Sequence, residues 1–210
     1  MRFTAIIIPF LIFKVGLLSC QAFSTTSPQA IDSVEAKAKK LKQYYLLSKS
    51  SVPEVADMYQ DKFFDEFPNT FKQLNQLYGY DGQAKKGAIL YYDAGNHIMG
   101  LFNNLKNIND TLYYKKIIGI TIGGKWDADA VNFFQHGLQE HIVAKPELAV
   151  FILKKMDKST IKSFWYFYFV GPIPKNHFYP SLEKIKMIDK DIYKLMMESY
   201  NQVSKVWEKE

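Results

Sequence analysis

Apolar residues recur at intervals of three and four along most of this 210-residue chain. That spacing is the period of an amphipathic α-helix. The pattern predicts a first helix over 31–45, a second from Pro53 to the break at Pro68, and a third that Asn69 caps and that ends near Tyr78. The glycine-rich stretch 79–87 separates these helices from the rest and is predicted to be a loop.

The second half of the chain continues the helical pattern. Further runs are predicted over 97–105, 127–142 with Asp127 as its cap, 146–156, 157–170 and 185–206. Only Tyr113–Thr121 has the β-branched composition of a strand. A single strand would have no partner here, so we expect this segment to be a buried helix. The fold class is therefore all-α, an irregular bundle of about eight helices.

The N-terminus carries an apolar run, Phe3–Phe13, behind Arg2 and ahead of Cys20, the only cysteine in the chain. The run is shorter than the roughly 20 residues of a membrane-spanning helix. Leu17-Leu18-Ser19-Cys20 resembles the lipobox of bacterial lipoproteins, in which the chain is cut before a cysteine that then carries lipid. Lys14 interrupts the apolar run, and the alternatives are an ordinary secretory peptide or an uncleaved anchor.

The lipobox resemblance implies an organisation and a location. Residues 1–19 would be the signal peptide, 20–29 a lipidated flexible tether and 30–210 a single helical domain. Lipid on Cys20 would attach the protein to a membrane and leave no thiol for a disulfide. Gln21 after the cysteine favours the outer membrane, with the protein facing the periplasm.

Composition and charge narrow the classes of partner. Without Arg2 and Lys14 the 27 basic residues become 25, against 21 acidic ones, a net charge of +4. Basic and acidic residues are interspersed, so we expect no nucleic-acid partner. The aromatic content is high, with 14 Tyr and 16 Phe, which indicates a densely packed core, an exposed aromatic binding surface, or both.

Two polar motifs are candidates for a ligand-binding or catalytic role. GITIGGK over 119–125 fits the spacing of a phosphate-binding loop, but Trp126 stands where Ser or Thr is needed. We therefore interpret it as a turn between helices. Asp129, Asn132, His136 and Glu140 share one face of a predicted helix, which is more typical of a solvated surface than of a metal site. We assign no catalytic residue, no cofactor and no metal.

Six consecutive aromatic residues, FWYFYF, span 164–169. A helix this apolar on every side belongs in the centre of a bundle. The alternative is that some of these rings, with those of the following proline-rich segment, form a surface for a protein partner. The residues predicted for that surface are Tyr166, Tyr168, Phe178 and Tyr179.

The segments FFDEFPNTF, LYGYDG and GGKWDADAVNFFQHG, between about 60 and 175, resemble small bacterial lipoproteins to which no activity is assigned. Some lipoproteins of this size are immunity proteins that block toxins. We therefore expect a lipid-anchored envelope protein that binds a protein partner, as an immunity or accessory protein. The alternative is an envelope hydrolase that acts on cell-wall or glycan material through Asp127, Asp129, His136 and Glu140.

Overall fold

The computed structural model describes residues 28–127, 129–171 and 180–207, and these residues form an all-α fold. The predicted fold class is confirmed. The helices are α1 (Pro28–Leu47), α2 (Pro53–Glu66), α3 (Phe71–Tyr78), α4 (Ala94–Asn103), α5 (Asp110–Thr121), α6 (Ala130–Ala144), α7 (Pro146–Leu153), α8 (Lys158–Phe169), α9 (Lys184–Ile188) and α10 (Lys190–Trp207). Two 3-10 turns, η1 (Tyr91–Asp93) and η2 (Pro180–Glu183), complete the helical part.

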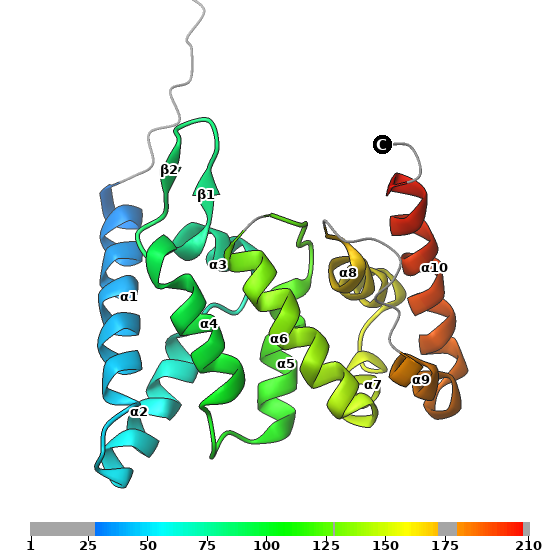
Figure 1. Cartoon of the computed structure of the whole chain (residues 1–210), viewed down its shortest axis with the longest axis horizontal. Coiled ribbons are helices and arrows are strands. Elements are labelled where there is room, and N and C mark those ends of the chain that lie inside the picture. Colours follow the sequence, from blue (N-terminus) through cyan, green and yellow to red (C-terminus); the bar gives the residue numbers. More distant parts are fainter. Residues whose placement is uncertain (1–27, 128, 172–179, 208–210) are drawn as a thin grey trace, which may run out of the picture.

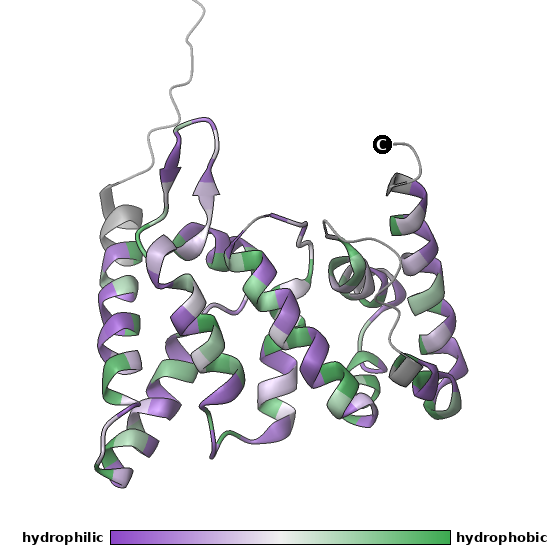
Figure 2. Ribbon diagram, viewed as in Figure 1, coloured by the Kyte–Doolittle hydropathy of each residue, from purple (hydrophilic) through white to green (hydrophobic). Residues whose placement is uncertain are grey.

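The helices stand in a row that leads from the N-terminal helices at one end to the C-terminal helices at the other (Figure 1). The pair α1 and α2 forms one end, α8 and α10 form the other, and α4 to α7 lie between them. Figure 2 shows hydrophilic and hydrophobic residues mixed along the outer helices α1 and α10, as expected of helices with only one face on a core. None of the described helices combines the length and the apolar character needed to cross a membrane.

Helix α8 has the central position that its aromatic sequence predicts. Phe164, Trp165, Phe167 and Tyr168 are all fully buried, because α10, α5 and α6 pack around this helix. The rings of Phe164 and Trp165 meet edge to face with centroids 4.7 Å apart, a geometry that aromatic pairs favour.

The segment 113–121 is helical, as predicted, and belongs to α5. Asn109 caps this helix: its Oδ1 accepts hydrogen bonds from the backbone amides of Thr111 at 2.9 Å and Leu112 at 3.2 Å. Ile117 and Ile118 are fully buried. The β-branched composition therefore reflects burial within the bundle, not pairing in a sheet.

The start of α3 and the segment after it differ from the prediction. Thr70 is the cap in place of Asn69, since its hydroxyl accepts from the amide of Gln73 at 3.2 Å. The Gln73 side chain in turn accepts from the amide of Asn69 at 2.9 Å, so Thr70 and Gln73 together cap the start of the helix. The predicted loop 79–87 contains a short antiparallel hairpin, β1 (Tyr80–Asp81) and β2 (Lys86–Gly87).

The long apolar stripe over 185–206 is divided into α9 and α10 at Asp189. The Asp189 carboxylate accepts from the amides of Asp191 at 3.0 Å and Ile192 at 2.9 Å, which caps α10. It also forms an ion pair with Lys154 at the end of α7, with 3.0 Å between nitrogen and oxygen. These bonds lower the pKa of Asp189 and turn the chain sharply.

The close approach of α4 and α6 depends on Gly137, which has no side chain. Gly137 faces the ring of Phe102, and a Cβ at residue 137 would lie 2.3 Å from that ring. No real Cβ comes so close to another heavy atom. The glycine therefore permits the contact that holds α6, and the residues at its start, against α4.

Candidate functional site

An open hollow of about 380 Å³ lies between the turn η1, the first turns of α4 and the start of α6. We call it the aromatic hollow. It is lined by Tyr91, Tyr92, Ala94, Gly95, Asn96, Met99, Asp129 and Phe133. Of these residues only Asp129 was a candidate from the sequence, where it belonged to the polar stripe.

A hydrogen bond between distant parts of the chain joins two residues that line the aromatic hollow, Tyr91 and Asp129. The Tyr91 hydroxyl donates to Oδ2 of Asp129, which lies 38 residues further along. This bond raises the pKa of Tyr91 to about 12, because the protonated phenol is the form that can donate to a carboxylate. The Tyr91 phenol therefore stays protonated at neutral pH.

Asp129 also has an unusual backbone conformation. Its φ is +55° and its ψ is −102°, outside the regions that L-residues ordinarily occupy. The residue precedes α6, and its carbonyl accepts from the amide of Phe133 at 3.0 Å. The predicted start of this helix at Asp127 is therefore wrong: the chain turns at Asp129 to reach Tyr91, and the helix begins at Ala130. Strain of this kind is concentrated at functional sites.

Large side chains of the aromatic hollow are open to solvent. Tyr92 is 94% exposed, Met99 45% and Phe133 42%. The neighbouring Tyr80 of the hairpin places its ring centroid 5.5 Å from that of Tyr91. Clustered exposed rings on a folded domain are typical of binding surfaces. The sequence signal that could have found them is the pair Tyr91-Tyr92 just before a helix, where one ring can point inward and the other is left outside.

The rest of the predicted polar stripe is a solvated face, which was the simpler interpretation. His136 Nδ1 and Glu140 Oε1 are 3.5 Å apart and both side chains are exposed. Asp129 lies seven residues before His136, a rise of about 10 Å along the helix. Asp129, His136 and Glu140 therefore do not converge. Among the described residues no group of three His, Cys, Asp or Glu side chains could hold a metal ion.

The glycine-rich segment 119–125 begins as the last residues of α5, which ends at Thr121, and the chain turns after it, as interpreted. A phosphate loop follows a strand, whereas this turn follows a helix. Gly123 has a φ of +71°, which glycine adopts readily. Its amide donates to the hydroxyl of Ser163 at 2.8 Å, joining the turn to α8. Trp126, after the turn, is 36% exposed.

The predicted partner surface is only partly within the described residues. Tyr168 is fully buried, so its prediction as a surface residue is wrong: α8 is enclosed by its neighbours. Tyr166 on the same helix is half-buried. Phe178 and Tyr179 lie outside the described residues, as does the predicted lipid attachment site Cys20.

No protein-family model, curated protein or solved structure matches this chain. In the aromatic hollow, exposed apolar side chains, a carboxylate and an unusual backbone conformation occur together.

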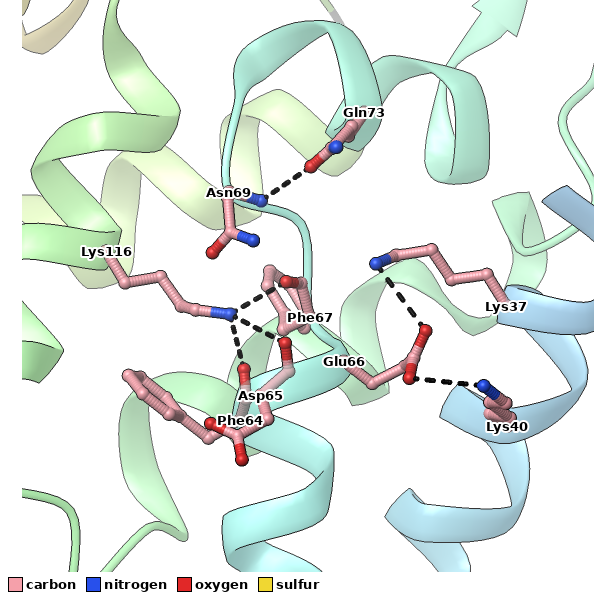
Figure 3. A network of polar contacts seen from close by, with 9 residues as sticks. All are labelled: Lys37, Lys40, Phe64, Asp65, Glu66, Phe67, Asn69, Gln73 and Lys116. Atoms are coloured by element: carbon pink, nitrogen blue, oxygen red, sulfur yellow. Dashed lines mark hydrogen bonds and ion pairs between the residues drawn. The ribbon is translucent and has the colours of Figure 1, made fainter. Parts of the chain in front are cut away.

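Lys116 is the partly buried cation of the core, and its ammonium group is engaged with backbone (Figure 3). Its Nζ donates to the carbonyl oxygens of Phe64 at 2.5 Å, Asp65 at 3.3 Å and Phe67 at 2.8 Å, which close the end of α2. Burial lowers the pKa of Lys116 to about 8. Its three donors match three carbonyls, so we interpret Lys116 as a helix cap and not as a nucleophile.

His97 is a second titratable side chain that is buried in the core. Its ring is buried among those of Tyr45, Phe63 and Tyr78. Nδ1 lies 3.0 Å from the Tyr78 hydroxyl. Burial lowers the pKa of His97 to about 4 and raises that of Tyr78. At neutral pH the imidazole is uncharged, and it serves packing between α4 and α3.

Proposed function

We propose that this protein is a lipid-anchored envelope protein that binds a protein partner through the aromatic hollow, in the manner of an immunity or accessory lipoprotein. The observation that carries the proposal is the exposed cluster of Tyr92, Met99 and Phe133 around one carboxylate. Tyrosine is enriched among the residues that dominate binding energy at protein interfaces. Here the rings are already placed by helices, which keeps the entropic cost of binding low.

The position of the first helix supports a site near the membrane. α1 begins at Pro28, so its first two residues lie within the predicted tether and seven residues, 21–27, separate it from Cys20. The eight Cα-to-Cα steps from Cys20 to Pro28 span at most about 28 Å. The beginning of α1 lies at the same end of the molecule as the hairpin β1–β2 (Figure 1), which borders the aromatic hollow. A lipid on Cys20 would therefore hold this end close to the membrane.

The alternative, a hydrolase of cell-wall or glycan material, has less support. It would need Asp127, Asp129, His136 and Glu140 to act on one substrate. His136 lies about two helical turns and Glu140 about three turns beyond Asp129, and both side chains are exposed. We therefore prefer binding to catalysis.

A crosslinking experiment tests the binding proposal. The photoreactive residue p-benzoyl-phenylalanine is placed at Tyr92 in the full chain, expressed in its native envelope, and at Met187 as a control that is also highly exposed. We expect one discrete protein adduct from residue 92 and none from residue 187. The purified partner should then bind at least tenfold more weakly to Phe133→Ala. Equal adducts from both residues, or no adduct from either, would contradict the proposal.

The anchor has its own test. We expect the native protein to partition into detergent and to carry the added mass of acyl chains at Cys20, whereas Cys20→Ala should remain in the aqueous phase. Intact-mass spectrometry of both proteins measures this. A mature N-terminus at another residue, or a free thiol on Cys20, would remove the lipoprotein part of the proposal and leave the binding surface to be judged separately.

A further inference from the structure

We infer that the aromatic hollow receives a cationic side chain of the partner, and that this side chain is arginine. The inference rests on the proposed function and specifies the chemistry of the partner. It is carried by the combination of one carboxylate, Asp129, with the exposed rings of Tyr92 and Phe133 and the half-buried ring of Tyr91 in a single hollow.

The charge of the residues that line the hollow favours a positively charged ligand. Among the described residues that line the hollow, Asp129 alone has a formal charge, and the others have aromatic, small, amide or thioether side chains. The face of an aromatic ring carries partial negative charge and attracts a cation within about 6 Å. The carboxylate and the rings therefore favour the same kind of ligand, although the chain as a whole is basic, with a formal net charge of +6.

The hydrogen bond from Tyr91 prepares the carboxylate for such a ligand. A carboxylate has about four acceptor positions, and the Tyr91 hydroxyl uses one of them. The bond holds the side-chain oxygen Oδ2 next to the turn η1. The backbone turn at Asp129 holds the main chain of the same residue. The group is thus held in place before the ligand arrives, which lowers the cost of binding.

Other side chains fit the aromatic hollow less well. A carboxylate or phosphate would be repelled by Asp129, and an apolar side chain would take the charge of Asp129 out of water without compensation. Lysine offers a compact and strongly hydrated ammonium. The guanidinium of arginine is planar, stacks on aromatic faces and donates a pair of parallel hydrogen bonds to a carboxylate. Tyr92, which is 94% exposed, supplies a ring for stacking.

The test uses small amides as probes. The full chain, labelled with ¹³C on methionine methyl groups and aromatic rings, is titrated with N-acetyl-arginine amide and with its uncharged isostere N-acetyl-citrulline amide. We expect saturable shifts of the Met99, Tyr92 and Phe133 signals with arginine amide, and binding of citrulline amide at least tenfold weaker. Equal binding of the two amides would overturn the inference.

Variants locate the site. Asp129→Asn should weaken the binding of arginine amide at least fivefold, and so should Tyr92→Ala, whose exposed ring contributes little to folding. Phe151→Ala is the control, because Phe151 is also exposed but lies on α7, where Lys155 already covers its ring at 3.7 Å. Should Asp129→Asn fail to fold, Tyr92→Ala decides the question alone. An unchanged affinity in Tyr92→Ala would overturn the inference.

The results separate this inference from the proposed function. A protein adduct at residue 92 without any preference for arginine amide would keep the binding function and refute the cationic ligand. A preference for arginine amide without a protein adduct would contradict the proposed partner-binding role. It would also overturn the inference as stated, since no partner would present the side chain.

Discussion

Gly137→Ala is expected to lower the free energy of unfolding by about 1 to 2 kcal/mol. The new Cβ would lie 2.3 Å from the ring of Phe102, which is itself buried between α4 and α6. The two helices would have to separate, or the ring would have to leave its rotamer, and overpacking of this kind costs about 1 to 3 kcal/mol or more. The gain in helix propensity from alanine, about 1 kcal/mol, offsets only part of that cost. Urea denaturation followed by circular dichroism measures the difference.

Gly119→Ala is the matched control for this prediction. Gly119 is also within a helix, α5, but a Cβ there would meet only the carbonyl oxygen of Asn69 at 3.6 Å, an ordinary contact. We expect Gly119→Ala to be neutral or slightly stabilising, because alanine favours a helix. If the two variants lost equal stability, helix conformation and not the contact with Phe102 would be the cause.

His97 is expected to make the fold sensitive to acid. Its pKa of about 4 in the folded protein lies below the ordinary value of 6.5, so the unfolded chain binds more protons between these values. The stability is therefore complete above pH 6.5 and is lost as the pH falls toward 4. A difference of about 2.5 pKa units corresponds to about 3 kcal/mol. Burial is the main cause of the lowered pKa of His97. The charges of Lys42 and Lys49 lower this pKa further, and that of Asp93 raises it.

The measurement compares pH profiles of stability. His97→Gln keeps a group that can bond to the Tyr78 hydroxyl but does not titrate. The loss of stability between pH 6.5 and 4 should be smaller in this variant by about 3 kcal/mol than in the native protein. His136→Gln, on the exposed face of α6, should follow the native profile. A His97→Gln profile parallel to the native one would show that His97 does not couple protonation to unfolding.

Local signals in the sequence were enough to predict most helices. A proline at a helix start and a capping carboxylate act only on residues a few positions away. In the structure α2 begins at Pro53, α7 begins at Pro146 and α8 begins directly after Asp157. Periodicity alone did not reveal the break at Asp189. The apolar stripe continues on both sides of it, and the ion pair with Lys154 that stabilises the break lies 35 residues away. The cap signal of Asp189 was local and could have been recognised.

The candidate site was less predictable than the fold. The bond between Tyr91 and Asp129 joins segments 38 residues apart, and it moves the start of α6 from the predicted Asp127 to Ala130. Whether an aromatic residue is exposed depends on which helices cover it. The sequence therefore placed a partner surface on Tyr168, which α10, α5 and α6 bury, and missed Tyr92, which nothing covers among the described residues.

The arrangement of the helices in a row also determines which parts of the molecule can unfold locally. α10 packs chiefly on α8 and α9, and α1 packs chiefly on α2, so each end is held by near neighbours along the chain. In such an arrangement the ends can unfold locally while the middle persists. The aromatic hollow belongs to α4 and α6, which pack on each other in the middle of the row. Amide protons there should exchange with solvent only through rarer and larger openings, and we expect the aromatic hollow to persist while the termini fray.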